Sequence, residues 1–437
     1  MLAAEQNRRL TEVGADTPAG ALLRRYWQPV GLVDDFAASA RPLRPVRVLA
    51  EDLVLFRTEA GGYALIGRHC PHRGADLRFG RLEAGGLRCA VHGWLLDGQG
   101  RCRETPAEPA GSTLNQRIRH SAYPCVARNG VVFAYLGPGE PPAFPNLDCF
   151  AAPDAYSFAF KGFVDCNWLQ VLEIGIDPAH ASYLHRFLRD EDPDAGYGLQ
   201  FRDAVAGGKA PMTRILREFT RPDIQVEETD FGLRLVTSRN LENQGMHVRV
   251  TNQVFPQAIV IPMSQEMTIT QWHVPVDDQR SYWYAMFTSF RDPVDKARMR
   301  AQRLELYELP DYTPKIGKAN DYGYDPAEQD TETYTGMGHD INVHDQWAVE
   351  SMGAIQDRTA ENLGRSDIGI AAYRRLLRNA IDRCEKGGQD LPLPSAAGHE
   401  VPIAIDAIAP IDDWQTAWRD LEAARRAGCR WLKSTKA

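Results

Sequence analysis

The sequence predicts an α+β protein, in which a small all-β domain precedes a larger domain of antiparallel strands and helices. Between residues 41 and 140, short runs rich in Val, Leu and Phe alternate with turns such as Gly61-Gly62 and Asn129-Gly130. That alternation is typical of short antiparallel strands. After residue 150, longer strand-like runs are followed by helical segments. The 437 residues are too many for one ordinary core, so two or three domains are expected.

The domain boundaries follow from changes in composition along the chain. Residues 1–40 are predicted to form an N-terminal helical lead-in, and residues 41–140 the all-β domain. The Pro-rich stretch GPGEPPAFP, at 137–145, has the composition of a linker. Residues 150–437 then form the larger domain. The sequence contains no GxGxxG or Walker loop, so no nucleotide site is evident.

In the larger domain, the run that starts at Phe158 is predicted to be a strand that leads into a helix, and 169–190 is predicted to be helical. Five further strands are predicted at 224–229, 233–239, 247–255, 268–276 and 281–290. Apolar and polar residues alternate along 247–255, as expected for a sheet that is covered on one face. The pattern becomes helical at 341–386 and again at 411–428.

The composition argues against several classes of function. Hydrophobic residues make up 43% and charged residues 25% of the chain, as in an ordinary soluble globular protein. The formal net charge of -8 disfavours nucleic acid as a partner, because phosphate binding needs a basic surface. No apolar run approaches the roughly 18 residues of a membrane span. The polar start MLAAEQNRRLTEVG is not a secretory signal, so we expect a cytoplasmic protein.

The eight cysteines are too few for a disulfide scaffold in a chain of this length. Six of them are scattered singly and are expected to be ordinary half-buried thiols: Cys102, Cys125, Cys149, Cys166, Cys384 and Cys429. Cys70 and Cys89 differ, because each has a histidine close by in the sequence.

The first candidate metal motif reads C-x-H-x16-C-x2-H and consists of Cys70, His72, Cys89 and His92. Thiolate and imidazole ligands suit zinc or an iron–sulfur centre. Zinc fingers usually group Cys with Cys and His with His, whereas here each loop supplies one of each. A Rieske cluster needs this set, since two Cys hold one iron and two His hold the other. The alternatives are a structural zinc site and a chance grouping, and His69 is interpreted as a neighbour rather than a ligand.

The second candidate motif is Glu173-x3-Asp177-x2-His180-x4-His185. Asp177 and His180 are three residues apart, so they would share one face of a helix. His185 could reach the same metal if the helix loosens after His180. Two imidazoles and one carboxylate form the facial triad of non-haem Fe(II) oxygenases. Taken alone, the two histidines could equally be satisfied core residues.

The carboxylate of this triad has several candidates. Asp177 and Glu173 are the local ones. A distant acid, Asp345 in the segment NVHDQWAVESMG, is preferred because that segment is rich in polar residues within a helical pattern. Its rivals are Asp340 and Glu350.

The two motifs, in this order and at this separation, resemble the α subunit of Rieske non-haem iron aromatic ring-hydroxylating oxygenases. The segments that carry the resemblance are CPHRGADL, CAVHGW, NWLQVLEIGIDPAHASYLH and HDQWAVESMG, and it extends from RRYWQPV at 25–31 to QDRTAENLGRSD at 356–367. They are closest to the phthalate dioxygenase and aromatic O-demethylase group, whose members act on aromatic acids and methoxyarenes. The resemblance implies a Rieske [2Fe-2S] domain and a catalytic domain of helix-grip, START-like fold.

The resemblance also assigns residues and an assembly. It implies that Cys70, His72, Cys89 and His92 ligate the [2Fe-2S] cluster, and that His180, His185 and Asp345 ligate a mononuclear non-haem Fe(II). Asp177 matches the family's bridging aspartate, between His180 and His92 of a neighbouring subunit. Such a bridge implies a head-to-tail homotrimer, alone or stacked into a hexamer.

The implied activity is that of a terminal oxygenase. Electrons from NAD(P)H would come from a separate reductase, with flavin, ferredoxin or both, because the chain has no dinucleotide loop of its own. With O2, the enzyme would hydroxylate or O-demethylate an aromatic carboxylate, such as a methoxylated acid or a lignin-derived biaryl. The alternative within the class is cis-dihydroxylation of the ring. Outside it, the competing hypotheses are an electron carrier of Rieske ferredoxin type and a zinc-stabilised binding protein.

Candidate substrate residues are less specific. Arg217, Arg221 and Arg239 could clamp a carboxylate, although surface pairing with neighbours such as Glu218 or Asp223 would explain them equally. Four apolar residues could form pocket walls or plain core: Phe255, Met263, Trp272 and Trp283. Asn167 matches a polar position near the iron site of the family that the chain resembles.

Overall fold

The computed structural model describes residues 2–37, 41–190, 211–263, 266–388, 392 and 401–434. The chain divides into two compact units. The N-terminal unit comprises Glu12–Ala143 and the short segment Val274–Asp278, and the C-terminal unit comprises Met1–Thr11, Phe144–His273 and Gln279–Ala437. None of the helices in the described ranges has both the length and the apolar character that a membrane-spanning segment needs.

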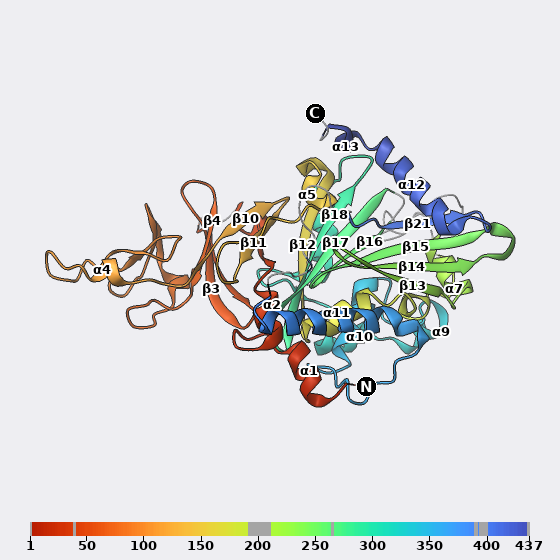
Figure 1. Ribbon diagram of the computed structural model, residues 1–437, viewed down its shortest axis with the longest axis horizontal. Coiled ribbons are helices and arrows are strands. Elements are labelled where there is room, and N and C mark those ends of the chain that lie inside the picture. Colours follow the sequence, from red (N-terminus) through yellow and green to blue (C-terminus); the bar gives the residue numbers. More distant parts are fainter. Residues whose placement is uncertain are drawn as a thin grey trace. The chain divides into compact units, whose positions relative to one another are not determined.

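The N-terminal unit is built from three small antiparallel sheets (Figure 1). The first has the order β1 (Trp27–Leu32), β11 (Val131–Tyr135), β10 (Cys125–Arg128). The second has the order β2 (Leu43–Val48), β3 (Glu51–Arg57), β4 (Tyr63–Gly67), β9 (Ala122–Tyr123). The third has the order β5 (Arg81–Glu83), β6 (Gly86–Arg88), β7 (Leu95–Leu96), β8 (Cys102–Glu104). Its short helices are α2 (Pro18–Leu23), α3 (Asp34–Ala37), η1 (Leu77–Phe79) and α4 (Leu114–Arg117).

The N-terminal lead-in differs from its predicted extent. The sequence predicts helical structure through residue 40, but Trp27–Leu32 forms β1 and pairs with β11. Five of its six residues are buried. The strand therefore completes a sheet whose other members follow more than 90 residues later, a pairing partner that local sequence does not reveal.

The C-terminal unit contains one eight-stranded antiparallel sheet. Its path is β12 (Ser157–Val164), β18 (Arg280–Ser289), β17 (Met267–Asp277), β16 (Ala258–Pro262), β15 (Met246–Val254), β14 (Gly232–Asn240), β13 (Asp223–Thr229). The eighth strand, β21 (Ile405–Ala409), pairs with the first half of β15, and β16 pairs with its second half. The strands predicted from the sequence are confirmed, whereas β16 and β21 were not predicted.

The two faces of this sheet have different roles. On one face, Val236, Val248 and Val250 form a core with Trp414 and Trp418 of α12 (Trp414–Gly428). On the other face, α11 (Ile368–Glu385) packs against β13 and β14. Figure 1 shows the two helices on opposite sides of the strands. The helix α11 can lie on the sheet because its buried residues recur every three or four positions.

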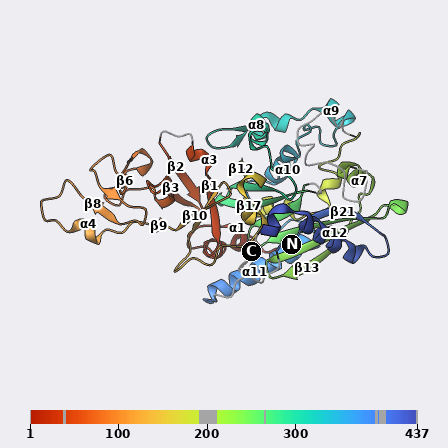
Figure 2. The same cartoon turned by 90° about the horizontal axis from the view of Figure 1, so that it is seen from above.

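The remaining elements of the C-terminal unit are mostly short. They are α1 (Ala4–Thr11), α5 (Asp148–Ala151), η2 (Asp154–Tyr156), α6 (Trp168–Gly175), η3 (His180–Ser182), α7 (Met212–Glu218), η5 (Glu242–Gln244), α8 (Lys296–Leu306), β19 (Tyr307–Glu308), β20 (Thr313–Pro314), η6 (Lys318–Gly323), α9 (Pro326–Thr331), α10 (Ile341–Glu350), η7 (Arg365–Asp367) and α13 (Arg430–Ser434). Figure 2 shows α8 and α11 on opposite sides of the strands.

The helix predicted over 169–190 is interrupted. Helix α6 begins at the cap Asn167, whose side chain accepts a hydrogen bond from the N–H of Leu169 at 3.1 Å, and it ends at Gly175. Pro178 explains the interruption, because proline has no N–H and disfavours helical geometry in the preceding residue. The spacing of Asp177 and His180 predicts that they share one helix face. That prediction is wrong, because the helix ends before both residues.

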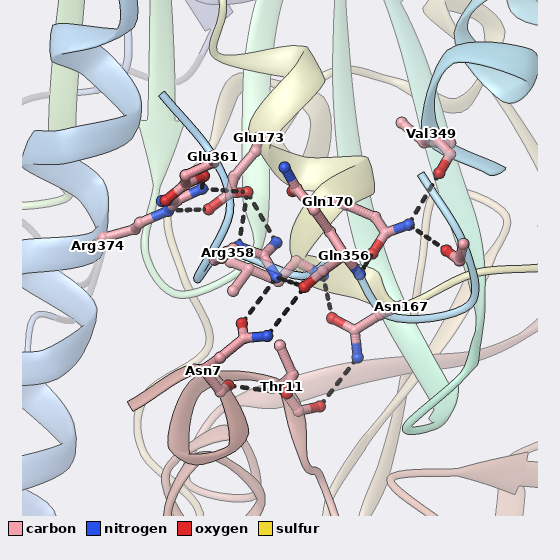
Figure 3. Close-up of polar contacts among 12 residues, drawn as sticks. Asn7, Thr11, Asn167, Gln170, Glu173, Val349, Gln356, Arg358, Glu361 and Arg374 are labelled. Carbon is pink, nitrogen blue, oxygen red and sulfur yellow. Dashed lines mark hydrogen bonds and ion pairs between the residues drawn. The ribbon is translucent and has the colours of Figure 1, made fainter. Parts of the chain in front are cut away.

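A buried ion network holds α6 in place (Figure 3). Glu173 is 4% exposed. Its carboxylate forms ion pairs with Arg374 at 2.5 Å and with Arg358 at 2.8 Å. Arg374 also pairs with Glu361, and Arg358 donates to Asn7 of α1 at 3.2 Å. Burial alone would raise the pKa of Glu173, but the two arginines hold it below its usual range.

We expect the substitution Glu173→Gln to lower the free energy of unfolding by about 3–5 kcal/mol at neutral pH, because it removes the anion of the buried Arg358 and leaves the buried Arg374 with Glu361 alone. A carboxyl with a lowered pKa stabilises the folded state at neutral pH, and that stability is lost as pH falls through its folded pKa. The difference from wild type should therefore shrink in acid, as measured by denaturant unfolding.

The matched control is Arg375→Ala, which removes an exposed pair with Glu228 whose side chains are 58% and 65% exposed. That change should cost under about 1 kcal/mol. Equal losses of unfolding free energy in Glu173→Gln and Arg375→Ala would show that the buried network stabilises the fold no more than an exposed ion pair does.

Candidate metal centres and active-site cavity

Two tight loops of the N-terminal unit carry the first candidate centre. Cys70 follows strand β4, and Cys89 directly follows β6. Each loop returns on itself, since the N–H of Gly74 donates to Cys70 O at 2.8 Å and that of Gly93 to Cys89 O at 3.1 Å. Both glycines have positive φ, +78° and +72°, which a residue with a Cβ would adopt only with strain.

The four side chains of this motif lie close together. Cys70 and Cys89 are buried, at 2% and 4% exposure. The rings of His72 and His92 have centroids 4.5 Å apart, and His72 also stacks on Trp94 at 4.5 Å. Burial, and the neighbouring Cys89 thiol to a smaller extent, raise the pKa of Cys70 to about 11.

This donor set fits an iron–sulfur cluster. The raised pKa makes the Cys70 thiol a poor thiolate by itself, and bound iron would supply the positive charge that stabilises the thiolate. Two sulfur and two imidazole donors, with one of each from each loop, are the ligands of a Rieske centre. His69 stays outside the set, and its Nδ1 lies 3.2 Å from Gly74 O.

The second candidate centre lies in the C-terminal unit and brings together His180, His185 and Asp345. One potential ligand atom from each lies within 4.8 Å of the other two. Asp345 Oδ1 is 3.2 Å from His185 Nε2 and 3.8 Å from His180 Nε2. His180 belongs to η3, just after the interruption at Pro178, and Asp345 projects from α10, which packs against α6.

These residues have the properties that a metal requires. Asp345 Oδ1 is buried and accepts no hydrogen bond from any described residue. Such an oxygen is costly unless a cation lies beside it. Burial, and then the neighbouring His185, lower the pKa of His180, which favours the neutral form that binds metal. Its Nδ1 donates to Asp177 O at 2.5 Å, which directs Nε2 toward the centre.

The rival carboxylates are engaged elsewhere. Asp340 caps α10 through the N–H of Asn342 at 2.8 Å. Glu350 accepts from the N–H of Asp165 at 2.9 Å and from Tyr322 Oη at 2.7 Å, and burial raises its pKa. The buried ion network occupies Glu173.

Asp177 lies beside His180, and its backbone makes the closer contact with that ring. Its side-chain Oδ1 accepts from the N–H of Ala179 at 2.8 Å, and its Oδ2 is 3.9 Å from His180 Nδ1.

A cavity of about 190 Å³ extends from this centre to the sheet. Alternate residues of several strands line it, as expected when successive side chains of a strand point to opposite faces. The strand residues are Val164, Leu235, Arg249, Thr251, Ile259, Ile261, Pro262, Gln271, His273 and Trp283. Residues of α6, α7 and α10 complete the wall. Most of the lining is apolar, and Arg249 is its one guanidinium among the described residues.

The arginines expected to clamp a carboxylate lie away from this lining. Arg217 pairs with Asp190 at 2.8 Å. Arg239 is buried and donates from Nε to Phe219 O at 3.0 Å and from Nη2 to Pro178 O at 3.3 Å, so it supports the backbone instead. Burial lowers its pKa to about 10. Arg221 is exposed.

Of the expected apolar walls, Met263 and Trp283 line the cavity, whereas Phe255 and Trp272 do not. Trp272 packs against Phe150, with ring centroids 5.7 Å apart. It alternates along β17 with Gln271 and His273, so it faces the other side of the sheet. Asn167 acts as the cap of α6, and its Nδ2 donates to Thr11 O at 3.0 Å.

The sequence prediction missed the polar lining residues of β15 and β17: Arg249, Thr251, Gln271 and His273. The alternation within 247–255 and 268–276 separates two sets of side chains, but it does not identify which set faces the cavity. Arg249 is held by Asp406 of β21, which also accepts from His247 Nε2 at 2.6 Å. Burial would raise the pKa of Asp406, but these two neighbours lower it to about 2.

Two family models match the chain. A model of the Rieske [2Fe-2S] domain matches residues 26–124. A model described as "LigXa C-terminal domain like" matches residues 134–433, which is more than half of the chain.

Similar proteins include oxygenase subunits. The chain is 32% identical to the phthalate 4,5-dioxygenase oxygenase subunit of Pseudomonas putida, across 97% of this chain and 95% of that protein. It is 32% identical to the 5,5'-dehydrodivanillate O-demethylase oxygenase subunit of Sphingobium sp. (strain NBRC 103272 / SYK-6), across 89% and 82%. The terminal oxygenase of carbazole 1,9a-dioxygenase from Nocardioides aromaticivorans IC177 has a TM-score of 0.56 at 17% identity, across 89% and 98%, which supports the fold alone.

We expect Asp345→Ala to lower the iron content by about one atom per chain, because a facial triad needs its carboxylate. The visible absorption of an iron–sulfur cluster should remain, since the first centre lies in the other unit. Elemental analysis and absorption spectra of the purified variant measure both. The control Asp340→Asn keeps a capping side chain, and loss of iron in it would point to the wrong carboxylate.

Proposed function

This chain belongs to the Rieske non-haem iron oxygenases, and we propose that it hydroxylates or O-demethylates an aromatic carboxylate bound in the cavity beside Asp345. It is the terminal oxygenase component of such a system, an oxidoreductase with a Rieske [2Fe-2S] cluster and a mononuclear non-haem iron. Oxygenase subunits of this family work with a separate reductase or ferredoxin component.

We further propose which residues hold each group. Cys70, His72, Cys89 and His92 are the cluster ligands, and His180, His185 and Asp345 the iron ligands. This division places the cluster in a domain of residues 41–140 and the iron in a domain of residues 150–437. Asp177 is then the residue that connects His180 with His92 of the partner subunit in a head-to-tail homotrimer, which is free or stacked into a hexamer.

When bound, the mononuclear iron supplies the activation of O2, using electrons that originate from NAD(P)H. The protein residues have other tasks. Asp177 O fixes the ring of His180 through Nδ1, and the apolar lining excludes water from the reacting atoms. The cavity walls hold the ring of the substrate next to the centre, so that the position of bound substrate decides which atom reacts.

Arg249 is the single observation that favours a carboxylate substrate. Its guanidinium lies on a mostly apolar wall, where its side chain is 19% exposed. Asp406 and the carbonyl of Pro262, at 3.0 Å, hold it in place. A guanidinium carries five N–H donors in a planar fork that matches a carboxylate. The two relatives reported above bear names that refer to aromatic acids.

Hydroxylation or O-demethylation is the leading reaction, and cis-dihydroxylation of the ring is the second candidate, because the relatives include a dioxygenase as well as an O-demethylase. The deciding experiment supplies iron-loaded protein with a surrogate reductase, NADH and O2, and screens aromatic acids by product mass. One added oxygen, or loss of a methyl with formaldehyde release, supports the leading reaction. Gain of two oxygens and two hydrogens identifies the dihydroxylase.

We expect Arg249→Gln to weaken binding of aromatic acids by about ten- to a hundredfold, because charge-assisted hydrogen bonds contribute about 1.5–3 kcal/mol. The matching primary amides carry no charge, so their affinity should change little. Calorimetric affinities for benzoate and benzamide measure both effects. Arg217→Gln is the control, since Arg217 lies outside the cavity lining. If Arg249→Gln weakens the affinity for benzoate and for benzamide equally, Arg249 does not bind the carboxylate of the substrate.

A further inference from the structure

His273 is a buried imidazole on the cavity wall that has no partner among the described residues. It lies on β17, is 2% exposed and belongs to the lining. Neither Nδ1 nor Nε2 forms a hydrogen bond with a described residue. Its backbone is fixed, because its N–H donates to Gln257 O at 2.9 Å. A neutral imidazole has one donor and one acceptor, so His273 offers both to whatever the cavity contains.

Three other polar side chains on this wall, those of Asn342, Gln346 and Arg249, already have partners within the protein. Asn342 donates from Nδ2 to Asp340 Oδ1. Gln346 donates from Nε2 to Glu350 Oε1 at 3.1 Å. Arg249 is held by the carboxylate and carbonyl contacts described above. Both ring nitrogens of the buried His273, by contrast, are left for a ligand.

Two other roles fit His273 less well. It lies outside the candidate metal-binding group of His180, His185 and Asp345. A role in packing alone is also unfavourable, since each unpaired buried polar group costs about 1–3 kcal/mol. Phenylalanine or leucine would fill the same space without that cost.

The packing around His273 restricts its ring. A Cβ built on Gly175, the last residue of α6, would lie 3.8 Å from His273 Nε2 and 2.5 Å from Ile259 Cδ1. The end of α6 therefore lies against β16 and β17 without room for a side chain. Hydrogen bonds depend steeply on direction, so a ring held in this way can select one position on a bound molecule.

The imidazole is neutral at physiological pH, because burial lowers its pKa to about 3. A neutral imidazole hydrogen-bonds to uncharged oxygens and forms no ion pair with a carboxylate. We propose that His273 is a specificity-determining residue that binds an uncharged oxygen substituent, a hydroxyl or an ether, on the ring of the substrate. This inference rests on the proposed function, in which Arg249 binds the carboxylate of the same molecule.

The test compares ligands that differ at one oxygen. The probes are 3-methoxybenzoate with 3-ethylbenzoate, and 4-methoxybenzoate with 4-ethylbenzoate, in which a methylene replaces the ether oxygen. Their affinities for the iron-loaded full chain are measured by calorimetry without O2. We expect the preference for the methoxy member of one pair to fall about five- to tenfold in His273→Phe, since one net hydrogen bond is lost.

The control Ile259→Val trims an apolar part of the same wall and should weaken both members of a pair alike. His273→Phe should be at least as heat-stable as wild type, because it removes two unpaired polar atoms. His273→Leu allows the same comparison if the phenylalanine variant folds poorly.

An unchanged methoxy-to-ethyl ratio in both His273 variants would overturn the proposal, as would an equal change of that ratio in Ile259→Val. If the wild-type protein binds none of the four probes, the proposed substrate class of aromatic carboxylates is wrong. The inference about His273 is then wrong as well. If the wild-type protein binds both members of a pair and His273→Phe leaves their affinity ratio unchanged, the inference about His273 is wrong. The proposed function is then unaffected.

Discussion

The buried carboxylate of Glu173 is the interaction on which the position of the proposed iron site depends. It draws Arg358 and Arg374 to the same point of α6, and Arg358 reaches on to Asn7 of α1. Each of these charges would be unfavourable alone in the interior. The helix α6, the segment around Arg358 and the helix α11 are therefore fixed relative to one another before any metal binds (Figure 3).

The C-terminal end of α6 determines the backbone conformation at His180. Because Pro178 stops the helix, the backbone between Gly175 and His180 leaves helical geometry, and Asp177 O becomes available to the ring of His180. Helix α10 packs on α6 and presents Asp345. The candidate metal-binding group is thus assembled by two helices and one interruption, and a continuous helix would direct these side chains differently.

Prediction from the sequence was effective where chemistry is local. The Cys70–His72 and Cys89–His92 loops have glycines at the turns that they need, so spacing alone predicts four donors on two tight loops. The α+β class and six of the eight strands of the large sheet followed from the sequence pattern. Which face of a strand lines the cavity could not be derived, because Trp272 and His273 are neighbours with opposite environments. The place of Arg249 depends on Asp406, which lies 157 residues later.

The alternation of the sheet also has an evolutionary consequence. On β14 and β15, Leu235 and Arg249 face the cavity, whereas Val236, Val248 and Val250 form the core under α12. Substitutions at the first set change what the cavity accepts, while the second set maintains the packing. Mutational drift can therefore explore new substrates at little expense in folding, in keeping with related enzymes whose names refer to molecules as different as phthalate and 5,5'-dehydrodivanillate.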